Sequence, residues 1–186
     1  MSEAQDTIQA AEAGLFWQSR TDRNYRRMLL QHRPLWHYVK QYIRTHGIER
    51  VLEVGGGLRP PARRWVSQYQ GIEPHEEADA LHKDFLTLDV SPWRHVDLLL
   101  ACGVIEHTGP SWVTFLHQVR QVAARHTMVG FFRPLTRRRT TWKCDARGFW
   151  LNSFAIRDIQ RVLAAFDLPG RFELLGPRDT ILVIEL

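Results

Sequence analysis

The residues best suited to chemistry lie in a glycine-rich corner between Val51 and Pro60. The stretch reads V-L-E-V-G-G-G-L-R-P, and Pro61 follows it. The apolar residues around Glu53 predict a buried strand, and the three glycines permit positive φ and let a ligand approach the main chain. The two prolines suit the first turn of a helix, where their missing N–H groups cost nothing. A strand that turns sharply into a helix in this way predicts a nucleotide-cofactor site.

The glycine spacing separates this corner from two common phosphate-binding loops. It has no Gly-Lys-Ser/Thr ending, and Gly-x-Gly-x-x-Gly fails because Pro60 follows Arg59. The remaining pattern is Glu-x-Gly-x-Gly, and in it the chain resembles the class I S-adenosylmethionine (SAM) dependent methyltransferases. That resemblance implies that Glu53 and residues Gly55, Gly56 and Gly57 bind SAM, with S-adenosylhomocysteine as the product. An NAD-dependent enzyme is disfavoured because the glycine spacing is wrong.

Two acidic residues downstream extend the resemblance. Glu73, in Gly-Ile-Glu-Pro, ends a predicted strand about 20 positions after the first motif, where a Rossmann-like fold places a carboxylate against ribose hydroxyls. Pro74 is expected beside it at the cofactor. The resemblance also implies that Asp84 meets the adenine amino group and that Phe85 packs on the ring. The segment from Glu73 to Asp84 is about half the family's usual length, so we expect a truncated helix there.

The run from Asp97 to His107 resembles the fourth-strand motif of small-molecule methyltransferases, in which Val-Ile-Glu-His follows the strand. By this resemblance, backbone groups near Ala101 and Cys102 face the methionine portion of SAM, and His107 lies near the transferring methyl. His107 is the candidate general base, because histidine titrates near neutral pH. A loop-anchoring role for His107 is the alternative, and Glu106 is expected to be structural or adjacent to the cofactor.

The same motif bears on metal binding. The metal-dependent small-RNA terminal 2′-O-methyltransferases carry Glu-x-x-Glu-His at this position, and Gly103 stands where their first glutamate would be. An incomplete ligand set predicts that no metal is bound.

The period of the apolar residues predicts an α/β fold. We expect a Rossmann-like, mostly parallel seven-stranded sheet with helices on both faces and an antiparallel C-terminal hairpin strand. Residues 1–186 are expected to form one domain, with a helical lead-in over 1–48 and the Rossmann-like core over 49–186. The predicted strands are Arg50–Val54, Gln70–Glu73, Val96–Ala101, Thr127–Phe132, Arg171–Leu175 and Thr180–Glu185; the predicted helices after the lead-in are Pro61–Tyr69, Trp112–Val122 and Ile156–Phe166.

Composition limits the location of the protein and the redox state of its thiols. The 186 residues carry a net charge of +5 and two cysteines, Cys102 and Cys144, which predict reduced thiols rather than a disulfide framework. Residues Met1 to Leu15 lack the basic and apolar regions of a signal peptide, and no run of 18 apolar residues occurs. We therefore expect a cytoplasmic protein with no membrane partner.

The methyl acceptor is the open question. The segment 131–153 interleaves aromatic and basic residues, which suits a lid over a small anionic or aromatic molecule, an RNA surface, or a solvated basic loop. We expect methyl transfer to an oxygen or nitrogen, and less favourably a carbon, of a small molecule. An RNA methyltransferase and a non-catalytic SAM-binding protein are the alternatives, and the oligomeric state stays open. The candidate substrate-binding residues are Trp17, Tyr25, His107, Arg133, Trp142 and Trp150.

Overall fold

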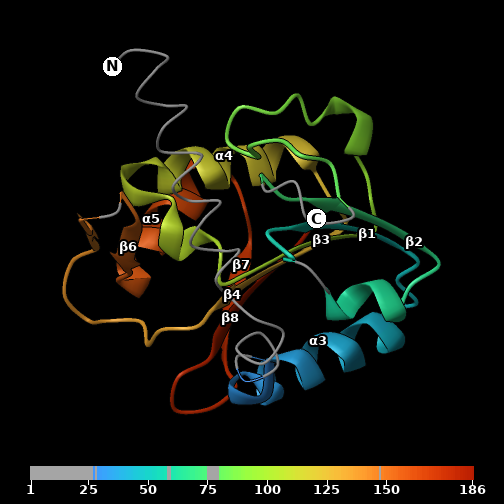
Figure 1. The fold of residues 1–186 in the computed structure, drawn as a ribbon, viewed down its shortest axis with the longest axis horizontal. Helices are drawn as coiled ribbons and strands as arrows, with labels where there is room; N and C mark the ends of the chain where they lie inside the picture. The colour runs from blue at the N-terminus through green and yellow to red at the C-terminus, as the bar shows by residue number, and fades with distance from the viewer. Residues whose placement is uncertain (1–26, 28, 58–59, 75–79, 147) are drawn as a thin grey trace.

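A six-stranded sheet forms the centre of the described chain (Figure 1). The computed structural model describes Arg27 and residues 29–57, 60–74, 80–146 and 148–186. The strands lie in the order β2-β1-β3-β4-β8-β7, and β5 and β6 form a separate hairpin. The strands are β1 (Arg50–Val54), β2 (Gln68–Ile72), β3 (Leu98–Cys102), β4 (His126–Phe131), β5 (Thr141–Cys144), β6 (Trp150–Ser153), β7 (Gly170–Leu174) and β8 (Thr180–Glu185). The helices are α3 (Arg33–Thr45), α4 (Trp112–Val122) and α5 (Ile156–Ala165), with 3₁₀ turns η1 (Pro61–Arg64), η2 (Ser91–Trp93), η3 (Ile105–His107) and η4 (Gly109–Ser111).

Strands β2, β1, β3 and β4 pair in parallel, whereas β8 is antiparallel to both β4 and β7. The mostly parallel sheet with an antiparallel C-terminal strand is therefore as predicted. The predicted count of seven strands is not confirmed, because the sheet of the described residues has six strands. On the side of β2 away from β1, only Leu81 forms a bridge, to Ile72. The Leu81 amide donates to the Gly71 carbonyl at 2.9 Å. The short connection after β2 leaves too few residues for both a crossover helix and a full strand.

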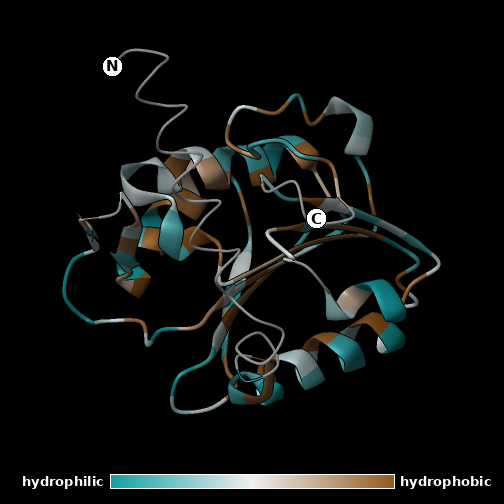
Figure 2. Cartoon of the chain, viewed as in Figure 1, coloured by the Kyte–Doolittle hydropathy of each residue, from teal (hydrophilic) through white to brown (hydrophobic). Residues whose placement is uncertain are grey.

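Helices cover both faces of the sheet, and their apolar sides face it (Figures 1 and 2). Strand β3 is buried at all five positions, because its side chains alternate between the two helical layers. None of the helices in the described part of the chain has both the length and the apolar character needed to span a membrane. One layer joins α3 residues Leu35, Val39 and Ile43 to Leu98 and Leu100; the other joins Phe115, Leu116, Ile159 and Leu163 to Leu99 and Val129.

Two local elements differ from the sequence predictions. The helix expected over Pro61–Tyr69 is only the turn η1, and β2 already begins at Gln68. Only Ala62 of η1 is buried, so the segment lacks the apolar stripe that stabilises a longer helix. The β5–β6 hairpin was not predicted, since β5 exposes all four of its residues. This hairpin projects from the region between β4 and α5.

Candidate active site

The glycine loop after β1 is built so tightly that side chains larger than hydrogen do not fit. Gly55 and Gly57 have φ of 68° and 67°, a region that strongly favours glycine. The Gly55 amide donates to the Ile72 carbonyl at 2.8 Å, and a Cβ at Gly55 would overlap Val104 Cγ2. The loop therefore sits at the carboxyl edge of the sheet, joined to the ends of β2 and β3.

Glu73, directly after β2, closes this loop. Its Oε2 accepts a hydrogen bond from the Gly57 amide at 3.0 Å, and the residue is only 8% exposed. Burial raises the pKa of the Glu73 carboxyl, while the Gly57 hydrogen bond and nearby His82 act in the opposite direction. The structure thus brings the predicted Glu73 and the glycine loop together, and Pro74 follows as an exposed residue.

A second carboxyl, that of Glu53, lies beneath the loop. It is 1% exposed, and burial raises its pKa to about 8, with a Tyr69 hydrogen bond lowering the value and the charge of Glu73 raising it. Among the described residues, none donates a hydrogen bond to Glu53 Oε2. A Cβ at Gly56 would lie 3.1 Å from both Glu53 Cδ and Tyr69 Oη. Burial thus favours the protonated form of Glu53, and Tyr69 is a neighbour that the sequence did not indicate.

Asp84 and Phe85 differ in their exposure to solvent. Asp84 is exposed, and its Oδ1 accepts from the Leu86 amide at 2.9 Å. Phe85 is 4% exposed, and its ring centroid lies 5.3 Å from that of Phe115 on α4. The Phe85 ring is therefore part of the core cluster, and its packing on the adenine ring stays a prediction.

The end of β3 presents its backbone at the same edge. The side chains of Ala101 and Cys102 are buried on opposite faces of the sheet, and burial raises the pKa of the Cys102 thiol. Gly103 follows with φ of 70°. Its amide donates to the Gly130 carbonyl at 2.8 Å, and a Cβ there would overlap the Phe132 ring. The carboxyl end of β3 therefore presents main-chain atoms at this edge of the sheet, because the side chains of Ala101 and Cys102 are buried in the two core layers.

Turn η3 carries Glu106 and His107. Glu106 is 3% exposed, and its Oε1 accepts from the Phe132 amide at 2.7 Å, which ties η3 to the end of β4. Burial raises the Glu106 pKa to about 7, opposed mainly by that hydrogen bond. His107 is exposed, and its Nδ1 lies 3.1 Å from the Trp150 carbonyl oxygen. The predicted His107 and Trp150 are therefore in contact.

Solved structures share this fold. Burkholderia thailandensis 1,6-didemethyltoxoflavin-N1-methyltransferase, with S-adenosylhomocysteine bound, superposes with a TM-score of 0.71 at 12% identity, covering 100% of this chain and 91% of that one. The DhpI complex with S-adenosylhomocysteine gives 0.66 at 10% identity, covering 96% of each chain. Magnesium protoporphyrin IX methyltransferase from Synechocystis gives 0.60 at 12% identity, covering 84% of each. The fold is that of the class I SAM-dependent methyltransferases. Neither a protein-family model nor a curated protein sequence matches the chain.

Within this methyltransferase fold, the β5–β6 hairpin lies over η3 and η4. Asn152, fully buried on β6, donates through Nδ2 to the Gly109 carbonyl at 2.8 Å and the Ile105 carbonyl at 3.3 Å. The Trp150 ring packs on Gly109, where a Cβ would come within 2.5 Å of Trp150 Cδ2. The hairpin is thus fastened to the turn that carries His107.

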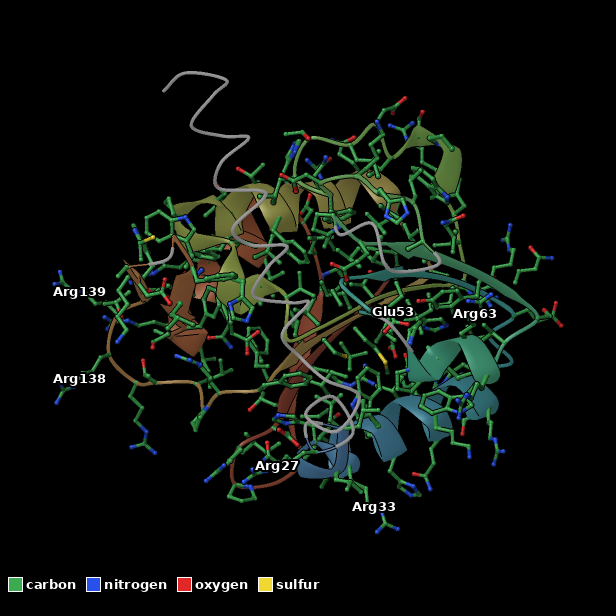
Figure 3. All side chains as sticks on the ribbon, viewed as in Figure 1. Arg27, Arg33, Glu53, Arg63, Arg138 and Arg139 are labelled. Carbon is green, nitrogen blue, oxygen red and sulfur yellow. The ribbon has the colours of Figure 1, made fainter. Side chains whose placement is uncertain are left out.

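The other predicted acceptor residues within the described ranges are exposed. Trp142 on β5 is 46% exposed, and Arg133, just beyond β4, is exposed and interacts electrostatically with Glu106. Arg138 and Arg139 extend outward from the loop before β5, whereas Glu53 lies inside the molecule (Figure 3). Trp17 and Tyr25 lie outside the described residues. No three His, Cys, Asp or Glu side chains within the described ranges gather in a way that could hold a metal ion.

A buried histidine–aspartate pair at this edge of the sheet was not predicted from the sequence. His32 Nδ1 lies 2.6 Å from Asp179 Oδ1, and the His32 ring stacks on Phe132 with centroids 3.8 Å apart. The two partners are 147 positions apart, and no motif or period in the sequence links them.

Asn152→Ala is expected to lower the free energy of unfolding by about 1–3 kcal/mol, because two buried carbonyls lose their donor. Urea unfolding measures the effect. Ser153→Ala, the adjacent residue on β6, is the matched control and should change stability by less than about 0.5 kcal/mol. Equal losses in the two variants would contradict the role given to the Asn152 side chain.

Proposed function

We propose that the protein is a SAM-dependent methyltransferase that transfers a methyl group to an oxygen or nitrogen of a small, anionic or aromatic acceptor. The observation that carries this proposal is the glycine loop closed by buried Glu73 at the carboxyl edge of the sheet. Ligands bind at that edge in open α/β folds. The S-adenosylhomocysteine bound in the three compared structures supports the choice of cofactor.

The described residues fit such a cofactor. Gly55, Gly56 and Gly57 leave the main chain open to close approach, and Glu73 can accept hydrogen bonds from vicinal ribose hydroxyls. We assign Asp84 to the adenine amino group and the backbone of Ala101 and Cys102 to the methionine portion. Glu53 Oε2, which has no hydrogen-bond partner among the described residues, is a further hydrogen-bonding group beneath the loop. When bound, SAM supplies an activated methyl on a cationic sulfur, and the chain's own task is to hold the acceptor at attack distance.

The acceptor side is assigned to the surface beside η3. His107 and Trp150 lie there in contact, and Arg133 adds a positive charge that suits an anionic acceptor. Trp142, with Trp17 and Tyr25, completes the proposed substrate-binding set. General-base catalysis by His107 stays a prediction, to be tested by His107→Gln once an acceptor is known.

Isothermal titration calorimetry with SAM, S-adenosylhomocysteine and NAD tests the cofactor assignment. Binding of both SAM species and not NAD is expected, and failure of both to bind would refute the proposal. Incubation with methyl-labelled SAM and a panel of anionic and aromatic small molecules, with an RNA arm, then tests transfer. Labelled RNA, with binding that weakens steeply with salt, would replace the small-molecule assignment. Cofactor binding without turnover on any acceptor would indicate a SAM-binding protein.

Glu73→Gln is expected to weaken S-adenosylhomocysteine binding by about 10- to 100-fold, because a charge-assisted hydrogen bond contributes about 1.5–3 kcal/mol. Calorimetry gives the dissociation constant directly. Glu49→Gln makes the same change at an exposed position on the opposite, amino edge of the sheet and should leave the affinity unaltered. An unchanged affinity in Glu73→Gln would remove the ribose assignment.

A further inference from the structure

The His32–Asp179 pair has the composition of a proton-accepting dyad. His32 is 8% exposed and Asp179 is 3% exposed, and they meet through His32 Nδ1 and Asp179 Oδ1 at 2.6 Å. A carboxylate that accepts the Nδ1 hydrogen fixes the imidazole tautomer, leaves the Nε2 lone pair available, and stabilises the imidazolium formed on proton uptake. No other described residue forms a hydrogen bond with the His32 ring.

The dyad lies at the edge of the sheet that carries the cofactor loop. Asp179 directly precedes β8, whose first residue, Thr180, pairs with Phe131 at the end of β4. The next residue, Phe132, stacks on His32 and packs so closely on Gly103 that no Cβ would fit there. A continuous series of contacts therefore leads from His32 through Phe132 to the end of β3.

His32 has a carboxyl partner that His107 lacks. The His107 Nδ1 contacts a neutral carbonyl oxygen at 3.1 Å, and the residue is exposed to solvent. The His32 Nδ1 instead contacts the buried Asp179 carboxyl at 2.6 Å, which holds the ring in one orientation and leaves Nε2 as the proton acceptor. Such a base remains shielded from bulk water while it acts.

We propose that His32, held by Asp179, is the general base of the methyl transfer in place of His107, an inference that rests on the proposed function. His32 Nε2 takes the proton that the acceptor's O–H or N–H loses while the acceptor's lone pair forms the bond to the methyl carbon. The electrons of the breaking carbon–sulfur bond stay on sulfur, which becomes a neutral thioether. Asp179 balances the positive charge that His32 gains.

Other titratable groups at this corner act on the dyad. The Cys102 thiol interacts electrostatically with Asp179 and Glu106, and the Glu106 carboxyl receives the Phe132 amide. Arg133 lies next to Phe132 in the chain and interacts with Glu106. Because these residues lie close to the dyad, the inference is tested with all of them unchanged, in the wild-type protein.

Histidine side-chain ¹⁵N NMR on the wild-type protein tests the inference. The neutral His32 ring is expected to carry its hydrogen on Nδ1, the nitrogen that faces Asp179. Its ring signals should also differ between the SAM and S-adenosylhomocysteine complexes, because SAM carries a positive sulfur charge that S-adenosylhomocysteine lacks. His46, one residue past the far end of α3, is the internal control and should give the same signals in both complexes.

His32→Gln identifies the His32 signal by its loss, and His37→Gln, an exposed change on the same helix, is the matched control. A neutral His32 ring with its hydrogen on Nε2, or identical His32 signals in the two complexes, would overturn the base assignment while leaving the proposed function intact. Absence of binding by both SAM species would overturn both. With an acceptor found by labelled-methyl transfer, His32→Gln should lower kcat by about 100-fold or more, with the S-adenosylhomocysteine dissociation constant within about threefold of wild type; an unchanged kcat would also reject the assignment.

Discussion

Glu53→Gln is expected to stabilise the ligand-free protein at pH 8 by up to about 4 kcal/mol. The folded-state pKa of Glu53 is raised from 4.5 to about 8, and each pKa unit corresponds to about 1.4 kcal/mol. Because the folded pKa lies above the unfolded one, the stability that the protonated carboxyl confers is fully present below about pH 4.5. Its contribution is lost as the pH rises through about 8. Glutamine resembles the protonated carboxyl and removes this loss.

Urea unfolding between pH 5 and 8.5 measures the difference between the two proteins. The stability gap should open as the pH rises, while the contribution of Glu106, common to both, cancels. Glu49→Gln, at an exposed position, is the control and should follow the wild-type curve. Parallel pH curves for wild type and Glu53→Gln would show that the Glu53 carboxyl is not desolvated as described.

Gly55→Ala is expected to cost about 2–5 kcal/mol of stability and to abolish measurable S-adenosylhomocysteine binding. A left-handed backbone costs an alanine about 1–2 kcal/mol, and overlap with Val104 adds an overpacking cost of about 1–3 kcal/mol. Relief of that overlap would displace the loop that we assign to the cofactor.

Gly47→Ala separates these two contributions. Gly47 also has positive φ, at 58°, but a Cβ there meets nothing within 4 Å. Its cost should be that of the backbone alone, about 1–2 kcal/mol, with unchanged ligand affinity. Urea unfolding and calorimetry compare the variants. Equal effects of the two substitutions would show that contact with Val104 does not constrain the loop.

The elements that the sequence predicted well are those in which a local pattern and the final environment agree. Strand β3 is a continuous apolar run, and the structure buries it on both faces. The glycine loop and Glu73 were recognisable because a strand-to-helix corner and a following carboxylate occur at a fixed spacing. These features are local, so the residue order carries them.

The features that the sequence did not predict depend on distant contacts. Strand β5 has no buried side chain and forms because it pairs with β6, which Asn152 anchors to Gly109 and Ile105. The His32–Asp179 contact spans 147 positions. The seventh strand of the predicted sheet is not found among the described residues. Only the isolated bridge at Leu81 lies beyond β2, because the connection there is too short for a full strand. Tertiary packing decides such cases, and propensity does not.

Strand β8 hydrogen-bonds to a neighbour on each side, and five of its six residues are buried. Its amides should therefore exchange with deuterium only through global unfolding, whereas those of exposed β5 should exchange through small local openings. The two sides of the proposed site would then differ in rigidity. A stiff sheet beside a readily opened β5–β6 hairpin allows a substrate to enter or leave while the sheet stays intact.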